Sequence, residues 1–407
     1  MIPCDSSIWV QVEGALVEVT RMTETRQSWI TIAKAVALIL VIYIHSTPRD
    51  SVSAYLTGFV MPAFFVLYGV THNSSKVRSK LPKYISNRAR ALMIPYFVLG
   101  FVMFIMYLVT YPMVNLGFPP VDYIFWTIYG NGPLGRVTHL WFLRTMFFAI
   151  ILFSLIDRYV HDKPAILRYI IIAVTPAIGV AFKVEGVEIV AWGIDSVFIA
   201  LSFMMIGSEI RRHNHISPWS RGKYLDIVGF LSAIAVYSIL SLNNSFVNIG
   251  ESIYGNSIYV YMVTGVLGTY IVSLLSYYAV LRFPAVAHYA TKFNDLGQEI
   301  YETHPLMIEL NAQLFGGLAF WSTLTFMPVA PIVIINFPFA IIFSYLFASK
   351  VIGKSGILQL MFLGYRKPIV SLPKETFPVP LPNGDGEVRP TEEEEEEIKL
   401  LEEVLIE

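Results

Sequence analysis

The sequence predicts an all-α protein, a polytopic integral membrane bundle of about ten transmembrane helices with both termini in the cytoplasm. Of its 407 residues, 55% are hydrophobic and only 14% are charged, whereas a soluble chain carries roughly a quarter charged residues. Apolar segments of about 20 residues, the length that spans a bilayer, recur along the chain. Lys and Arg gather in every second loop between these segments, which is typical of cytoplasmic loops.

The expected spans cover most of the chain from residue 28 onward. They fall near 28–46, 54–72, 91–111, 139–157, 167–183, 190–210, 224–242, 258–280, 300–320 and 326–349. Val121–Tyr129 is apolar but too short to span, and we expect it to be re-entrant or interfacial.

Basic residues follow every even-numbered span. The loop after the second span contains Lys76, Arg78, Lys80, Lys83, Arg88 and Arg90 and no acidic residue. The alternate loops 184–189 and 243–257 contain no Lys or Arg, and 112–138 contains only Arg136. Because cytoplasmic loops are the basic ones, this alternation predicts both termini on the cytoplasmic side.

Composition divides the chain into three parts: an N-terminal extension (1–25), a transmembrane domain (26–354) and a cytoplasmic tail (355–407). Residues 365–390 are rich in Pro and polar residues, which is typical of a flexible linker. A run of acidic residues, Glu392–Glu397, then precedes a short segment with helical spacing. The single cysteine, Cys4, excludes an intrachain disulfide and a cysteine metal cluster; no metal is expected. Nucleic-acid binding is disfavoured, because the basic residues fit membrane topology.

The first span contains two ionisable residues, Lys34 and His45. They are eleven residues apart, so both lie on one helix face, separated by about 16 Å of rise. Charged residues are costly inside a bilayer and usually face a polar interior where they have a function. The alternative is structural: a lysine that snorkels to the headgroups and a hydrogen-bonded histidine.

Three further stretches carry chemistry-bearing side chains, each with a structural alternative. Arg88 and Arg90 precede the third span, and arginine suits phosphate, although positive-inside topology also explains them. His139 and Trp141 open the fourth span, where an interfacial tryptophan is ordinary, and Arg144 lies deeper and needs a partner such as Asp195.

The third of these stretches, Glu299–Pro305, brings together Glu299, Tyr301, Glu302 and His304. An acid beside a histidine can orient it for proton transfer near neutral pH. The alternative is a solvated cluster at the start of a helix.

Taken in order, the motifs are a basic residue eleven before a histidine, MPAFFVLYG, an Arg-rich loop ending in IPYF, HLWFL and EIYETHP. Together they resemble acyltransferase family 3, the membrane O-acyltransferases that modify glycans, and in particular its fucose O-acetylase-like branch. The resemblance covers about residues 26–350. It implies about ten spans and transfer of an acyl group, commonly acetyl, from cytoplasmic acyl-CoA to a sugar hydroxyl.

The resemblance also implies roles for single residues. His45 matches the family's histidine in the first span and is the leading catalytic candidate, with Lys34, Tyr301 and His304. Arg88 and Arg90 match the loop that meets acyl-CoA. Trp141, with His139, Arg144 and Glu302, is expected to line the substrate channel. Three positions depart from the family pattern: Tyr68 and Gly297 where serine is usual, and Glu302 where an apolar residue is usual.

The sequence therefore predicts an O-acyltransferase of a bacterial inner or plasma membrane, with acetyl-CoA as co-substrate. Its partners are the bilayer and a surface glycan or lipid-linked saccharide, and a homodimer is compatible with them. In this hypothesis His45 is the general base or acyl carrier, and Lys34 stabilises the oxyanion. The loops 112–138 and 243–257 recognise the acceptor.

Two other classes of protein compete with this interpretation. A secondary transporter or flippase for a glycan or small anion also has many spans and buried charges. Against it, neither an internal repeat nor paired broken spans are evident. A sensor or scaffold with degenerate catalytic positions is the second competitor, favoured by the departures at Tyr68 and Gly297.

Overall fold

The computed structural model describes residues 28–47, 51–110, 119–132, 138–182, 190–213, 223–315 and 331–367. All of them belong to one compact unit that extends to Lys367. The expected N-terminal extension and the Pro-rich and acidic parts of the tail lie outside the described residues.

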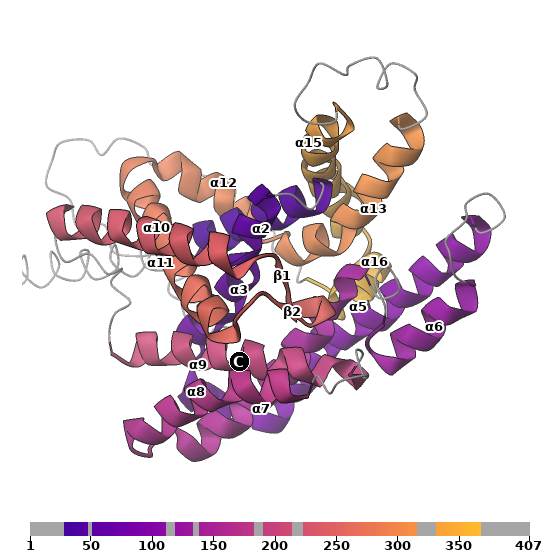
Figure 1. The fold of residues 1–407 in the computed structure, drawn as a ribbon. Helices are drawn as coiled ribbons and strands as arrows, with labels where there is room; N and C mark the ends of the chain where they lie inside the picture. The colour runs from indigo at the N-terminus through magenta and orange to yellow at the C-terminus, as the bar shows by residue number, and fades with distance from the viewer. Residues whose placement is uncertain are drawn as a thin grey trace, which may run out of the picture. The chain divides into compact units, whose positions relative to one another are not determined.

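The described chain is almost entirely helical (Figure 1). The helices are Ser28–Ser46, α2 Ser51–Thr57, α3 Val60–Thr71, α4 Ser74–Ser79, α5 Leu81–Thr110, α6 Pro120–Tyr129, α7 Trp141–Val160, α8 Ala165–Ala181, α9 Ile194–Arg212, α10 Lys223–Asn244, α11 Ile258–Arg282, α12 Pro284–Asn294, α13 Gly297–Phe315, α15 Pro331–Leu346 and α16 Gly356–Leu363. Short helical turns occur at η1 Thr138–Leu140, η2 Ala191–Gly193, η3 Ile249–Glu251, η4 Phe347–Val351 and η5 Ile352–Lys354.

Within the described ranges, seven helical segments are long and apolar enough to cross a bilayer. They are Ser28–Ser46, Ser51–Thr71, Leu81–Val109, Ala191–Arg212, Tyr224–Asn244, Ile258–Arg282 and Ile335–Lys354. The expected fifth span appears as the shorter apolar helix α8. The expected fourth and ninth spans correspond to α7 and α13, which carry ionisable residues such as Arg144 and Glu302. The fold class is confirmed as a polytopic helical membrane protein; the count of ten and the orientation of the termini stay predictions.

Helix α9 lies at the centre of the packing, against α3, α7 and α8. Its contact with α3 is close because two glycines meet there. A Cβ atom at Gly69 would overlap the carbonyl of Met204, and one at Gly207 would overlap the carbonyl of Val66. Small residues at helix crossings let two backbones approach in a membrane, where packing rather than the hydrophobic effect drives association.

The ends of α7, α8 and α9 are joined by buried charged groups. Arg168 donates from Nε to an oxygen of Glu209 at 2.6 Å, and both residues are buried. Asp157 lies between two histidines, His72 at 3.4 Å and His161 at 3.1 Å. Because buried charges are costly unless paired, this network fixes how these helices meet.

A small hairpin interrupts the helices between α10 and α11. Strands β1 (Val247–Asn248) and β2 (Ile253–Tyr254) pair antiparallel, with Val247 opposite Tyr254. The turn between them is η3, and its cap is Asn248, whose side-chain oxygen accepts from Gly250 N at 3.1 Å. The 243–257 segment is therefore an ordered element.

Residues after the expected domain end at 354 pack back onto the helices. Helix α16 lies against α5 and ends at Gly364, whose φ of 71° and close approach to the carbonyl of Arg90 both require glycine. The amide nitrogen of Gln298 on α13 bonds Ala91 O of α5 at 2.9 Å and Phe362 O of α16 at 3.2 Å. Lys367 Nζ bonds the buried carboxylate of Glu299 at 2.6 Å. These contacts fix the start of α13, the helix that carries Tyr301 and His304.

Candidate active site

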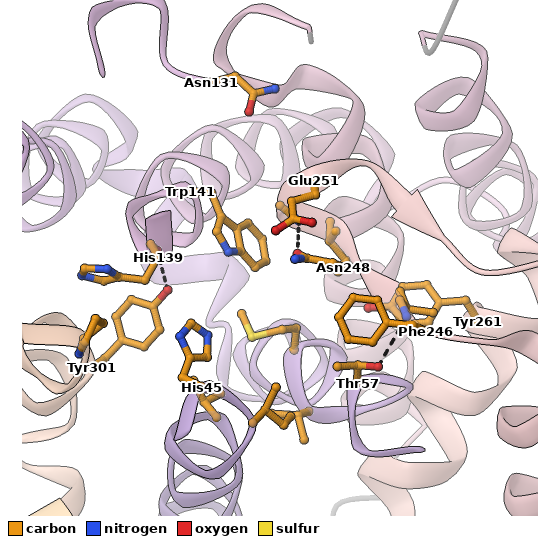
Figure 2. Close-up of a pocket in the computed structure, with 18 of the residues that line it drawn as sticks. His45, Thr57, Asn131, His139, Trp141, Phe246, Asn248, Glu251, Tyr261 and Tyr301 are labelled. Carbon is orange, nitrogen blue, oxygen red and sulfur yellow. Dashed lines mark hydrogen bonds between the residues drawn. The ribbon is translucent and has the colours of Figure 1, made fainter. Parts of the chain in front are cut away.

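A pocket of about 350 Å³ lies where the end of the first helix meets η1, α7, α13 and the β1–β2 hairpin (Figure 2). The first helix contributes His45, and η1 and α7 contribute His139 and Trp141. Tyr301 comes from α13, and the hairpin contributes its segment 246–251. The remaining lining residues are Val41, Ile44, Thr57, Val60, Met61, Asn131, Gly132, Tyr261 and Pro305.

Three histidines from three different elements meet beside this pocket. The ring of His45 lies 5.0 Å from that of His304 between centroids, with an edge-on angle of 74°. The ring of His139 lies 5.9 Å from that of His304. His139 and His304 are buried, whereas His45 is exposed and its exposed surface lines the pocket.

The hydrogen bonds of the buried histidines determine where their protons are. His304 Nδ1 lies 2.6 Å from the carbonyl of Tyr301, and a carbonyl only accepts, so Nδ1 carries the hydrogen. In the neutral ring, Nε2 is then unprotonated, and it has no hydrogen-bond partner among the described residues. By the same reasoning, His139 Nε2 donates to Glu302 O at 3.2 Å. An unpartnered nitrogen of His304 therefore lies beside His45.

The neighbouring aromatic residues hold this arrangement in place. The hydroxyl of Tyr301 donates to the carbonyl of His139 at 2.6 Å, joining α13 to η1. Its ring packs against that of Phe142 at 5.1 Å between centroids. The indole of Trp141 is covered by the backbone of Gly250, where a Cβ would lie 2.5 Å from the ring. Figure 2 shows Trp141 and Tyr301 on the same side of the pocket as His45.

The expected donor-binding residues lie outside this pocket. The guanidinium of Arg88 stacks on the ring of Tyr84, 5.2 Å from its centroid. The hydroxyls of Tyr84 and Tyr68 are hydrogen-bonded, so Tyr68, where the resemblance leads us to expect serine, has a defined partner. Lys34 is half-buried and interacts electrostatically with Arg88. Arg90 is exposed on α5, the helix that also carries Arg88.

The structure thus separates the predicted residues into two groups. His45, His139, Trp141 and Tyr301 line the pocket, and His304 contacts His45 behind it. Lys34 and Arg88 lie together elsewhere, with Lys34 about 16 Å along the helix from His45. The predicted role of Lys34 at the reacting atoms stays a prediction, and its neighbour is Arg88, one of the two residues expected to bind the donor.

Two buried charged residues support the pocket from behind rather than lining it. Arg144 is fully buried and donates to Asn131 Oδ1 at 3.0 Å. Asp195 accepts from the hydroxyls of Ser252 and Tyr254, the latter at 2.6 Å. Burial and the nearby charge of Asp195 raise the pKa of the Tyr254 phenol, so Tyr254 stays a donor. Asp195 is near enough to favour the charge of Arg144, but no ion pair within 4 Å joins them in the described part of the chain.

We expect Asp195→Ala to destabilise the protein by about 3 kcal/mol or more, because two buried hydroxyls lose their acceptor and a buried guanidinium loses its nearby carboxylate. Asp195→Asn keeps one acceptor oxygen and should cost less. Thermal unfolding of the purified protein in detergent measures both. Tyr289→Phe on exposed α12 is the control, with no expected change in Tm. Equal Tm values for Asp195→Ala and wild type would contradict this role of Asp195.

Glu302 does not line the pocket that the structure describes. Its buried carboxylate accepts from Gln298 Nε2 at 2.9 Å, and its second oxygen has no partner among the described residues. Its backbone carbonyl, which accepts from His139, is the part of Glu302 nearest the histidines. The predicted channel role of its side chain, like that of Arg144, stays a prediction.

Several pocket residues were not predicted individually. Asn131, Asn248, Glu251 and Tyr261 reach the pocket from two loops and from α11. The only sequence signal for them was their position in or near the two loops expected to recognise the acceptor. No group of three or more His, Cys, Asp or Glu side chains suited to a metal ion occurs in the described ranges.

Comparison with protein families matches residues 27–348 to an acyltransferase domain, that of acyltransferase family 3. The chain belongs to this family. The match begins at the first helix and ends within η4, so it contains the whole pocket. Neither the comparison with curated proteins nor that with solved structures found a significant match.

Family membership identifies the chain as a membrane acyltransferase. An acyl donor and an acceptor are therefore its two reactants. Within the acyltransferase, α16 and Lys367 lie beyond the family match yet contact the helix that carries His304. This segment is a feature that the family model does not describe.

Proposed function

We propose that this acyltransferase moves an acetyl group from cytoplasmic acetyl-CoA to a hydroxyl of a surface glycan or lipid-linked sugar in the plasma membrane of a bacterium. The observation that carries the proposal is the position of the His45 side chain. Its ring is exposed in a 350 Å³ pocket, and it makes no hydrogen bond within the described part of the chain. A ring nitrogen of His45 is thus open to a substrate.

In the proposed reaction, a ring nitrogen of His45 removes the proton from the acceptor hydroxyl. The oxygen attacks the thioester carbonyl carbon, the carbon–sulfur bond breaks, and the CoA thiolate leaves and takes up the proton. The products are an ester and free CoA. General-base catalysis of this kind contributes typically 10²–10⁴-fold.

His304 acts on His45 rather than on the substrate. Its Nε2 is held unprotonated by the Nδ1 bond to the Tyr301 carbonyl. It therefore offers an acceptor beside the His45 ring. A partner that accepts from one nitrogen of a catalytic imidazole orients it and favours the form whose other nitrogen is free to take a proton. Tyr301 also fixes the position of His304, because its hydroxyl donates to the carbonyl of His139 and so joins α13 to η1.

The donor end of the site is formed by Arg88, Arg90 and Lys34. Three cations at the expected cytoplasmic end of the first and third spans suit the phosphates of CoA. The charged phosphates of CoA thus stay near the aqueous side, while the thioester end of the donor extends along the first helix toward His45. This division explains why the structure separates the basic residues from the histidines.

The proposed function is tested with radiolabelled acetyl-CoA and inverted membrane vesicles that contain the protein. We expect label in extracted glycan or glycolipid, and none in vesicles without the protein. Absence of both label transfer and acetyl-CoA binding would overturn the proposal and favour a transporter.

Arg88 and Arg90 are expected to act on the donor. The double variant Arg88→Ala/Arg90→Ala should raise the KM for acetyl-CoA by about tenfold or more, because each charge-assisted bond to phosphate is worth 1.5–3 kcal/mol. The KM for the acceptor should not change. Steady-state kinetics at varied acetyl-CoA measures this. Arg158→Ala, a basic residue at the end of α7, is the control; the same shift in that variant would show that only overall charge matters.

A further inference from the structure

We propose that the pocket selects acceptors without negative charge near the reacting hydroxyl, and that Glu251 sets this preference. The inference rests on the proposed function, because it names the class of acceptor for the same site: a neutral, hydroxyl-rich molecule such as an uncharged sugar.

The charge of the pocket wall is the first observation. Glu251 is half-buried at the hairpin side of the pocket and is the only carboxylate among the described lining residues. No Lys or Arg is among them. Arg144 bonds the lining residue Asn131 but does not itself line the pocket, and Asp195 is near enough to favour its charge. An acceptor carboxylate or phosphate would therefore meet Glu251 and no lining side chain that carries a permanent positive charge.

The hydrogen-bonding groups left for a ligand are the second observation. Thr57 accepts from Val247 N, and Asn131 is used by Arg144 and by Val190 O. Asn248 accepts from Gly250 N with its side-chain oxygen and lies beside Glu251 in the pocket wall (Figure 2). The hydroxyl of Tyr261 has no partner among the described residues, although its side chain is fully buried against the pocket.

These groups lie around aromatic surface. Figure 2 shows Asn248 and Glu251 on one side of Trp141, and Phe246 beside Tyr261. Amide and phenol groups can bond the oxygens of a polyol, the carboxylate of Glu251 can accept from its hydroxyls, and the aromatic rings can pack on its C–H faces. The pocket therefore offers an uncharged hydroxyl-rich acceptor both polar partners and apolar surface.

Repulsion gives the specificity. Two like charges a few ångströms apart in a partly desolvated pocket change affinity by tenfold or more, and specificity commonly depends on such a repulsive element. Glu251 is thus a specificity-determining residue rather than a catalytic one.

The test uses full-length protein in lipid vesicles with acetyl-CoA and two acceptors that differ only at C6, octyl β-D-glucopyranoside and octyl β-D-glucuronide. We expect wild type to acetylate the glucoside with a kcat/KM at least tenfold higher. Glu251→Gln should reduce this ratio at least threefold, and Glu251→Lys should shift it further toward the glucuronide. Glu309→Gln, an exposed carboxylate of α13 outside the pocket lining, should leave the ratio unchanged.

Equal wild-type kcat/KM values for the two acceptors, or a ratio that Glu251→Lys does not change, would overturn the inference while leaving the proposed function intact. Failure of the proposed function gives a different result, because wild type then acetylates neither acceptor and releases no CoA from acetyl-CoA. That result overturns both. Thermal unfolding of each variant shows whether the hairpin still folds.

Discussion

His45→Ala is expected to lower kcat for acyl transfer by about 10²–10⁴-fold, the range that a general base contributes. The physical reason is the position of the imidazole, which is exposed in the pocket and free of hydrogen bonds to described residues. His45→Gln should be equally inactive, because an amide fills the space but cannot take a proton at neutral pH. Transfer of label from acetyl-CoA, measured at saturating donor and acceptor, gives kcat directly.

Two controls separate chemistry from folding. His288→Ala removes an exposed histidine of α12 away from the pocket and should retain normal activity. Donor affinity of His45→Ala should stay near the wild-type value, because the cations proposed to hold CoA lie elsewhere. Near-normal kcat in a well-folded His45→Ala or His45→Gln protein would exclude His45 as the base.

Gly207→Val is expected to destabilise the protein strongly. Even a single Cβ at this position would overlap the backbone carbonyl of Val66, and a backbone cannot move aside as a side chain can. Overpacking a close contact typically lowers the free energy of unfolding by about 1–3 kcal/mol. Here α3 and α9 would have to move apart along their whole contact. We expect a Tm lower by several degrees or a protein that does not accumulate, measured by thermal unfolding and by the yield of monodisperse protein in detergent.

Gly297 provides the matched control. A Cβ there would lie 3.8 Å from Leu38 and 3.9 Å from Asn294, which is ordinary contact. Gly297→Ala and Gly297→Ser should therefore leave Tm nearly unchanged, and the serine would restore the residue usual in the family. A Tm for Gly207→Val equal to that of Gly297→Ala would show that the α3–α9 contact is looser than the structure indicates.

Much of the site could be predicted from local patterns. The eleven-residue spacing of Lys34 and His45 singled out the first helix, and the HLWFL and EIYETHP motifs singled out His139, Trp141, Tyr301 and His304, which lie at or beside the pocket. These residues are recognisable because ionisable and polar side chains stand out in apolar helices, where they are costly. Apolar length likewise identified the fold class.

The relation between the histidines required the tertiary structure. Spans alone place His45 near the outer end of the first helix and His304 near the inner start of the ninth, which separates them. The structure brings the two rings to 5.0 Å between centroids, with His304 in the first half of α13. Contacts from α16 and Lys367 then hold it there.

The sequence by itself determined the class of the protein, a helical membrane bundle, and its family, and it singled out most of the candidate site residues. Those properties depend on composition, period and short motifs, which are local. Only the tertiary structure decided that the three histidines meet beside one pocket, that Arg144 and Asp195 support it from behind, and that Asn248 and Glu251 complete its wall. Those contacts join residues more than two hundred positions apart, such as His45 and His304, and packing between helices, rather than any local pattern, brings them together.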